Sequence, residues 1–257
     1  RATAGGPFLA SAAGDQLDNP LAVVGTGTRV LGAIAVLGRY LALTVWPHRL
    51  AVDYSFDALG IGPGFVADGY SLIAGISILA LALIARRVGG PTAFALLLAA
   101  SAYSLVSNTV LLIGTVMAER LLYIPTIGLV LAGAPALDRA LARRQGSRIA
   151  IVALAAVCGG YAIVSTLRAH DWKSPITLFE SAVRVHPQSA RARMELASAY
   201  GRAGQAAKAE AEFAEAIRIL PTYAAAWYNL GNARARRGAL DAAAEAYRAA
   251  VEHAPRL

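Results

Sequence analysis

Long apolar runs alternate with short polar breaks over the first part of the chain, whereas the last part spaces its apolar residues at helical intervals. A membrane-spanning helix needs about 20 mostly apolar residues. Five runs approach this length and predict helical spans, and residues 1–28 predict a loop or surface-lying segment. The first run is barely long enough to span, so a re-entrant or interfacial helix is its alternative. The spans are expected at about 30–46, 69–85, 91–106, 121–137 and 149–166.

Arginines cluster in two of the polar breaks, 86–90 and 138–148. Short loops rich in Lys and Arg stay on the cytoplasmic side of a membrane. We therefore expect both breaks inside, with 47–68, the segment around Glu119 and everything after about residue 167 outside. These clusters explain much of the net charge of +8. Neither part of the chain has the dense basic face of a nucleic-acid-binding protein, so no nucleic-acid partner is expected.

Two copies of one pattern, 190–221 and 224–255, follow each other directly near the end of the chain. Their spacing of about 34 residues resembles that of the tetratricopeptide repeat (TPR), in which two antiparallel helices pack through small residues and aromatics. A half copy over 175–187 precedes them, and the last span occupies the place of its missing helix. The predicted fold is therefore all-α. A partial polytopic transmembrane domain covers 1–169, and a TPR α-solenoid covers 170–257.

One segment places charged and aromatic side chains inside an otherwise apolar stretch. Glu119, Arg120 and Tyr123 lie between Met117 and Pro125. A buried charge costs several kcal/mol unless it is paired or functional. Two interpretations stay open: a structural Glu–Arg pair that fixes a broken helix, or the wall of a site that binds an anion.

Further candidates lie in the predicted outer loop and on the repeats. Asp53 could contribute to the same outer face, or form a turn that caps the next segment. His48 could touch phosphate or lipid headgroups, or be merely interfacial. No metal-ligand spacing is evident. TPR arrays bind partner proteins in a concave groove. By resemblance to that family, the groove candidates are Ser198, Arg202, Tyr228, Asn232 and Arg236. These residues could equally form a solvated helix face.

Three ordered motifs followed by TPRs give a more specific resemblance. They are Trp46–Asp57, Gly114–Gly128, and Asp171-Trp172 with Leu178-Phe179, and Asp18–Ala22 adds a fourth. Together they resemble the TMTC family, the transmembrane and tetratricopeptide repeat containing proteins. The resemblance implies a C-type glycosyltransferase, a protein O-mannosyltransferase that uses a lipid-phosphate sugar donor outside the cytosol. It also implies a catalytic acid in the first outer loop, which is expected upstream of residue 1, so the catalytic residue is unknown.

The sequence as a whole favours the C-terminal portion of a membrane glycosyltransferase. It would transfer a sugar, by resemblance mannose, from a polyprenyl-phosphate donor to Ser or Thr of an extracytoplasmic protein. Arg120 would contact the donor phosphate, Glu119 would orient Arg120, and the repeats would engage the acceptor protein. The donor is a substrate, membrane lipid is a partner, and no cofactor is evident. The Ala-, Gly- and Arg-rich composition suggests a bacterial inner membrane with periplasmic repeats. The alternatives are a non-catalytic TPR scaffold of an envelope complex and an oligosaccharide ligase or polymerase.

Overall fold

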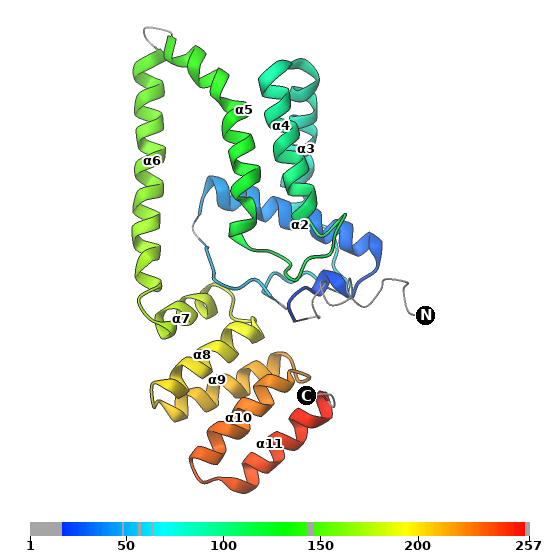
Figure 1. Cartoon of the computed structure of the whole chain (residues 1–257), viewed down its shortest axis with the longest axis vertical. Helices are drawn as coiled ribbons and strands as arrows, with labels where there is room; N and C mark the ends of the chain where they lie inside the picture. The colour runs from blue at the N-terminus through cyan, green and yellow to red at the C-terminus, as the bar shows by residue number, and fades with distance from the viewer. Residues whose placement is uncertain (1–16, 48, 56–57, 63, 143–145, 255–257) are drawn as a thin grey trace. The chain divides into compact units, whose positions relative to one another are not determined.

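The computed structural model describes residues 17–47, 49–55, 58–62, 64–142 and 146–254. All regular secondary structure in these residues is helical, which confirms the predicted all-α class (Figure 1). The chain divides into two compact units. The first unit contains Arg1–Arg49 and Ile61–Arg168, and the second contains Leu50–Gly60 and Ala169–Leu257.

Helices of the first unit lie over all five predicted spans. Within the described residues, four helical stretches are long and apolar enough to cross a membrane, and α4, with 17 residues, is shorter. Length and composition thus identify a multi-pass membrane protein. Two short 3-10 turns, η1 (Pro20–Ala22) and η2 (Glu119–Leu122), complete the unit. The helices are α2 (Thr26–Val45), α3 (Gly69–Arg87), α4 (Gly90–Val106), α5 (Tyr123–Ala142) and α6 (Gly146–Asp171).

Helix α2 runs across the ends of α3, α4 and α5 instead of alongside them (Figure 1). Its middle packs tightly on the start of α3, because a Cβ at Gly38 would lie 1.9 Å from the backbone oxygen of Tyr70. Arg39 adds an ion pair of 2.9 Å to Asp68 and stacks 4.6 Å from the centre of the Tyr70 ring. This crossing favours the interfacial alternative for the first run.

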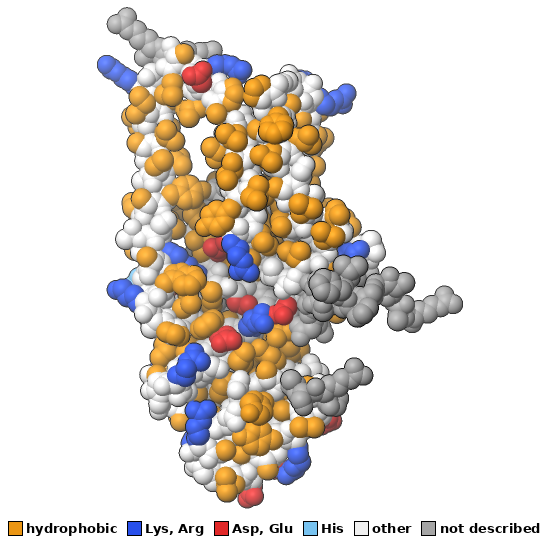
Figure 2. All heavy atoms as spheres, in the orientation of Figure 1, with side chains coloured by type: hydrophobic (Ala, Val, Ile, Leu, Met, Phe, Trp, Pro, Cys, Tyr) orange, Lys and Arg blue, Asp and Glu red, His pale blue; other side chains and the backbone are white. Residues whose placement is uncertain are grey.

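The other helices of the unit present apolar side chains outward. Large exposed apolar residues are frequent on α3, α5 and α6. Basic side chains gather at the end of the unit where α3 meets α4 and α5 meets α6 (Figure 2). They include Arg86 and Arg87 in the last turn of α3 and Arg139 in the last turn of α5. An apolar band that ends in arginines is the pattern expected of spans with a cytoplasmic end.

The second unit contains the repeats, in the predicted register. The first helices of the two full copies begin at Ala190 and Ala224, and the second helices begin at Ala206 and Leu240, so both pairs keep the same spacing. Repeated positions such as Leu196 and Leu230 are buried. The helices are α7 (Pro175–Val185), α8 (Ala190–Arg202), α9 (Ala206–Ile219), α10 (Ala224–Arg236) and α11 (Leu240–His253).

A small residue is required where the paired helices of the second copy meet. A Cβ at Gly231 of α10 would lie 2.6 Å from the Tyr247 ring of α11. The glycine lets the ring lie directly on the α10 backbone, which is the close approach that the repeat pattern predicts.

Candidate functional site

The charged pair of the central segment lies at the start of α5. Glu119 and Arg120 form the first half of η2, and Tyr123 begins α5 directly after it. Glu119 and Arg120 are exposed in this chain, and 73% of Tyr123 is exposed. Their position in an apolar stretch suggested buried charges, and that expectation is wrong for the described structure. Both side chains therefore lie at the surface of the chain and are accessible to a ligand.

The residues directly before this pair are buried, in contrast to the pair itself. Val116 and Met117 are each 2% exposed, and Ala118 is 8% exposed. The Tyr40 hydroxyl of α2 donates to the Ala118 carbonyl at 2.9 Å and accepts from the Ala118 N–H at 2.8 Å. One phenol thus satisfies both backbone groups of the residue that precedes Glu119.

A pair of buried asparagines holds the loop between α4 and η2. The Asn19 amide donates to the Asn108 Oδ1 at 2.8 Å and to the Ile113 carbonyl at 2.7 Å. Asn19 is 0% exposed and Asn108 is 1% exposed. In the sequence, Asn19 belongs to the Asp18–Ala22 motif, and Asn108 lies just after the apolar run 91–106. Because 89 residues separate the two asparagines, no local pattern could reveal their contact.

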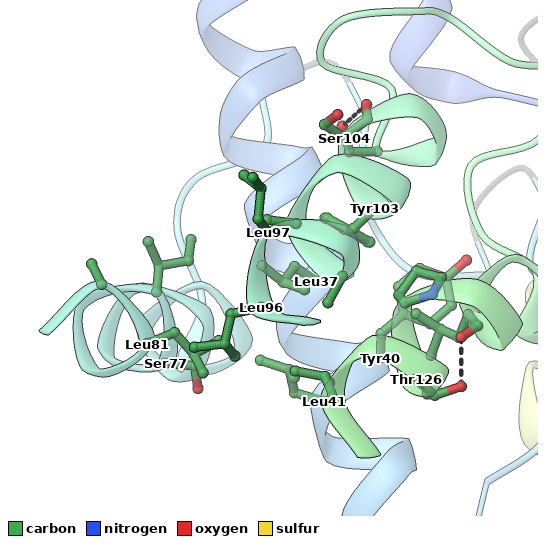
Figure 3. A pocket seen from close by; sticks show the side chains of 18 of the residues that line it. Leu37, Tyr40, Leu41, Ser77, Leu81, Leu96, Leu97, Tyr103, Ser104 and Thr126 are labelled. Carbon is green, nitrogen blue, oxygen red and sulfur yellow. Dashed lines mark hydrogen bonds between the residues drawn. The ribbon is translucent and has the colours of Figure 1, made fainter. Parts of the chain in front are cut away.

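An apolar cavity of about 650 Å³ lies between α2, α3, α4 and α5. Figure 3 shows Leu37 of α2 and Leu96 and Tyr103 of α4 around it. Its lining in the described chain contains no Lys, Arg, Asp or Glu, and its few polar groups are mostly hydroxyls. Leu122 also lines it, and Leu122 belongs to the same 3-10 turn as Glu119 and Arg120. The exposed charged pair therefore lies next to the wall of an apolar cavity.

The ion pair between Arg39 and Asp68 is a second charged cluster in this unit. The two side chains are 14% and 29% exposed. Asp68 also caps α3, where its Oδ1 accepts from the Ser71 N–H at 2.9 Å. Desolvation raises the pKa of Asp68, but the Ser71 hydrogen bonds and the Arg39 guanidinium outweigh it and hold that pKa below its usual value. We interpret this cluster as structural, since it joins α2 to the start of α3.

Asp53 belongs to the second compact unit and not to the unit of Glu119 and Arg120. Its Oδ2 accepts from the Ser189 hydroxyl at 2.6 Å and from the Ser55 hydroxyl at 2.7 Å. The neighbouring Tyr54 ring packs 5.3 Å from the His186 ring. Asp53 thus links its segment of the loop, with Tyr54 and Ser55, to the residues just before α8. The remaining candidate of this loop, His48, lies outside the described residues.

The five groove candidates of the repeats lie on α8 and α10, the first helices of the two full copies. Arg202 and Arg236 are exposed, and 54% of Tyr228 is exposed. Asn232 is half-buried and accepts a hydrogen bond of 2.8 Å from Tyr247 of its own repeat. Ser198 is half-buried beside Met194. Asn232 therefore has an internal structural role, whereas Arg202, Tyr228 and Arg236 are accessible to a partner.

No group of three or more His, Cys, Asp or Glu side chains in the described part of the chain could hold a metal ion. The first unit offers an apolar cavity with a cation and a carboxylate in the turn beside its wall. That combination suits a molecule with a long apolar part and an anionic head.

Comparison with known proteins agrees with the motifs. Residues 165–224 and 224–257 each match a sequence profile described as tetratricopeptide repeat. The chain is 27% identical to Protein O-mannosyl-transferase TMTC3 of Mus musculus over 222 residues, which is 84% of this chain and 24% of that protein. It is 28% identical to Protein O-mannosyl-transferase Tmtc3 of Drosophila melanogaster over 84% of this chain and 24% of that protein.

Protein O-mannosyl-transferase TMTC3 of Homo sapiens is 24% identical over 94% of this chain and 27% of that protein. The resemblance to TMTC proteins is thereby confirmed over most of the chain, which spans about a quarter of the length of these relatives. These three relatives are animal proteins, so they lend no support to a bacterial origin.

Proposed function

We propose that this chain is part of a membrane glycosyltransferase that moves a sugar, by similarity mannose, from a polyprenyl-phosphate donor to a protein hydroxyl. The premise is its similarity to proteins named protein O-mannosyl-transferases. The observation that carries the proposal is the apolar cavity of about 650 Å³, whose wall includes Leu122 in the same turn as Arg120.

The cavity and the charged turn suit the two parts of such a donor. The isoprene units next to the phosphate would lie among the apolar side chains of α2, α3, α4 and α5. The phosphate would meet Arg120, whose planar guanidinium matches phosphate oxygens in geometry and charge. Glu119 would orient Arg120 or contact the sugar hydroxyls. The repeats would engage the acceptor protein, for which TPR surfaces are suited.

The reaction asks two things of the protein. The acceptor oxygen forms a bond to the anomeric carbon while the bond from that carbon to the phosphate oxygen breaks, and the acceptor proton passes to a base. The polyprenyl phosphate leaves with one more negative charge than it carried in the donor. Arg120 would stabilise that added charge. No residue of this chain is assigned as the base.

The arginine-rich ends of α3 and α5 support a topology in which η2 and the repeats lie outside the cytosol. We keep the bacterial inner membrane, with periplasmic repeats, as a proposal from composition. A donor on the outer side and an acceptor engaged by repeats on that side would then share one compartment.

The test measures binding of farnesyl phosphate and of farnesol, which share a tail and differ in the phosphate. For the detergent-solubilised protein at full natural length, we expect Arg120→Ala to weaken farnesyl phosphate binding by about tenfold or more, the value of one charged hydrogen bond. Farnesol binding should not change. Leu96→Trp fills the cavity and should weaken both ligands. The matched control is Arg87→Ala, which removes an arginine from the last turn of α3 and should leave both affinities unchanged.

Two results would overturn the proposal. One is farnesyl phosphate binding that Arg120→Ala leaves intact, and the other is binding of both ligands that survives Leu96→Trp. A protein that binds neither ligand would favour the non-catalytic scaffold instead.

A further inference from the structure

The loop between α4 and η2 has no secondary structure to satisfy its own backbone. Residues 107–118 are described throughout and contain no helix or strand. Nevertheless Ser107, Asn108 and the stretch Val116–Ala118 are buried. Buried backbone N–H and C=O groups must find partners, and an unpaired one costs about 1–3 kcal/mol. The partners here include side chains that come from distant parts of the sequence.

Asn108 uses its whole hydrogen-bonding capacity within this loop. Its Nδ2 donates to the carbonyls of Thr115 at 3.1 Å and Val116 at 3.4 Å. Its Oδ1 accepts from the Ile113 N–H at 3.0 Å and from Asn19 at 2.8 Å. A side-chain amide has two N–H donors and an oxygen with two lone pairs, so all four positions are filled. Asp would lack the donors, and Leu would leave the Thr115 and Val116 carbonyls without this partner.

The backbone at Asn108 also selects this residue. Its φ is +60°, in the left-handed region that few residues except Gly and Asn adopt readily. The side chain of Asn19 is itself held in place, because its Oδ1 accepts from the Leu21 N–H at 3.0 Å. That bond fixes which end of the Asn19 amide faces Asn108.

Tyr40 completes the set at the end of the loop. It binds both backbone groups of Ala118. Asn19, Asn108 and Tyr40, hereafter the polar clamp, together hold the backbone at four positions, Ile113, Thr115, Val116 and Ala118. The next residues along the chain are Glu119 and Arg120. The position of Arg120 therefore depends on three side chains that do not touch the donor phosphate in the proposed pose.

We infer that the polar clamp is a set of positioning residues that fix Arg120 beside the apolar cavity for binding of the donor phosphate. This inference rests on the proposed function. A merely structural role would lower stability and weaken all ligands alike. A positioning role predicts that clamp variants weaken binding of a ligand with a phosphate more than binding of the same ligand without one, because Arg120 is displaced.

The test uses the ratio of farnesyl phosphate affinity to farnesol affinity, so that effects on tail binding cancel. Asn108→Gly keeps the left-handed backbone accessible and removes the amide. Tyr40→Phe keeps the ring in the cavity wall and removes the hydroxyl. Both variants should lower the ratio toward that of Arg120→Ala. The matched control is Tyr103→Phe, whose ring also lines the cavity and whose hydroxyl bonds the Ala33 carbonyl only at 3.5 Å. It should keep the wild-type ratio.

Combined variants decide whether the clamp acts through Arg120. When Arg120→Ala is already present, adding Asn108→Gly should change the ratio by less than about twofold, the scatter of independent effects. If Asn108→Gly lowers the affinity ratio in the Arg120→Ala background as much as it does in the wild-type protein, the inference is contradicted. It is also contradicted if Arg120→Ala lowers the ratio but Asn108→Gly and Tyr40→Phe leave it unchanged.

Hydrogen exchange separates failure of the clamp from failure of the proposed function. In Tyr40→Phe, the Ala118 amide should exchange about fivefold or more faster than in the wild-type protein, because its acceptor is gone. If exchange accelerates but Arg120→Ala does not change the ratio, the clamp exists and the donor-site role of Arg120 is wrong. If exchange does not change, the clamp is wrong.

Discussion

The contact between Asp53 and Ser189 makes the stability of the repeats depend on a loop more than a hundred residues earlier in the chain. The Asp53 carboxylate accepts from Ser189, which is 0% exposed, and the Ser189 hydroxyl in turn caps α8 by accepting from the Ala192 N–H at 3.0 Å. Asp53→Ala removes the acceptor and leaves a buried hydroxyl without its carboxylate partner.

The expected loss follows from these contacts. A hydrogen bond to a charged group contributes about 1.5–3 kcal/mol. Because Asp53 is half-buried, we take a value near the lower end of that range, about 2 kcal/mol. A change of 1 kcal/mol shifts the melting temperature of a domain of 60–100 residues by about 4–8 °C. The second unit is of that size, so Asp53→Ala should lower its melting temperature by about 10 °C.

The assay is thermal unfolding of the purified protein in detergent, followed by limited proteolysis of the repeats at each temperature. The matched control is Asp241→Ala, which removes an exposed carboxylate from the first turn of α11 and should cost at most about 1 kcal/mol. Combining Asp53→Ala with Ser189→Ala should give a coupling of about 1.5 kcal/mol. A loss no larger than that of Asp241→Ala, or strictly additive effects, would refute the reasoning.

Three further predictions address the first unit. Gly38→Ala should separate α2 from α3 and destabilise the protein by about 1–3 kcal/mol. The control Gly75→Ala should not destabilise it, because nothing lies within 4 Å of where a Cβ at Gly75 would be. Equal melting curves for the two variants would contradict the packing. The folded pKa of Asp68 is depressed, so its contribution is present above about pH 3.9 and is lost as the pH falls through the folded pKa. Asp68→Asn should therefore flatten the loss of stability as the pH falls below about 3.9, and an unchanged acid dependence would refute this. After Cys158→Ala, a membrane-impermeant thiol reagent added from outside should label Val110→Cys and not Arg87→Cys; the reverse would invert the proposed topology.

Patterns local in the sequence predicted the fold well. The apolar runs identified helices at the positions of α2 to α6, since helix length and hydrophobicity are properties of consecutive residues. The constant spacing of the two repeat copies predicted the register of α8 to α11, because each repeat packs mainly on its neighbours. The orientation of α2 was not predictable in this way. It depends on Gly38 and Arg39 meeting the start of α3, a contact that periodicity does not encode.

The candidate site was predictable only in part. Arg120 and Glu119 stood out because charge is rare in an apolar segment, but their exposure was not foreseen. The contact of the clamp asparagines was not predicted, since Asn is an ordinary turn residue and only the folded chain shows Asn19 against Asn108. Asp53 was predicted as a site candidate or a turn cap on the outer face, and its contact with Ser189, 136 residues further along, was not predicted. Long-range polar contacts of this kind leave no local pattern.

The most direct test of donor binding in the cavity is photo-crosslinking with a mannosyl farnesyl phosphate that carries a diazirine on its isoprenoid tail. We predict that the label attaches to cavity residues of α2 and α4, such as Leu37 and Leu96, and that unlabelled farnesyl phosphate competes with it. In Arg120→Ala, labelling at the same concentration should fall. Label spread over outward-facing residues of α6 such as Leu154 and Ile163, without competition, would contradict donor binding in the cavity.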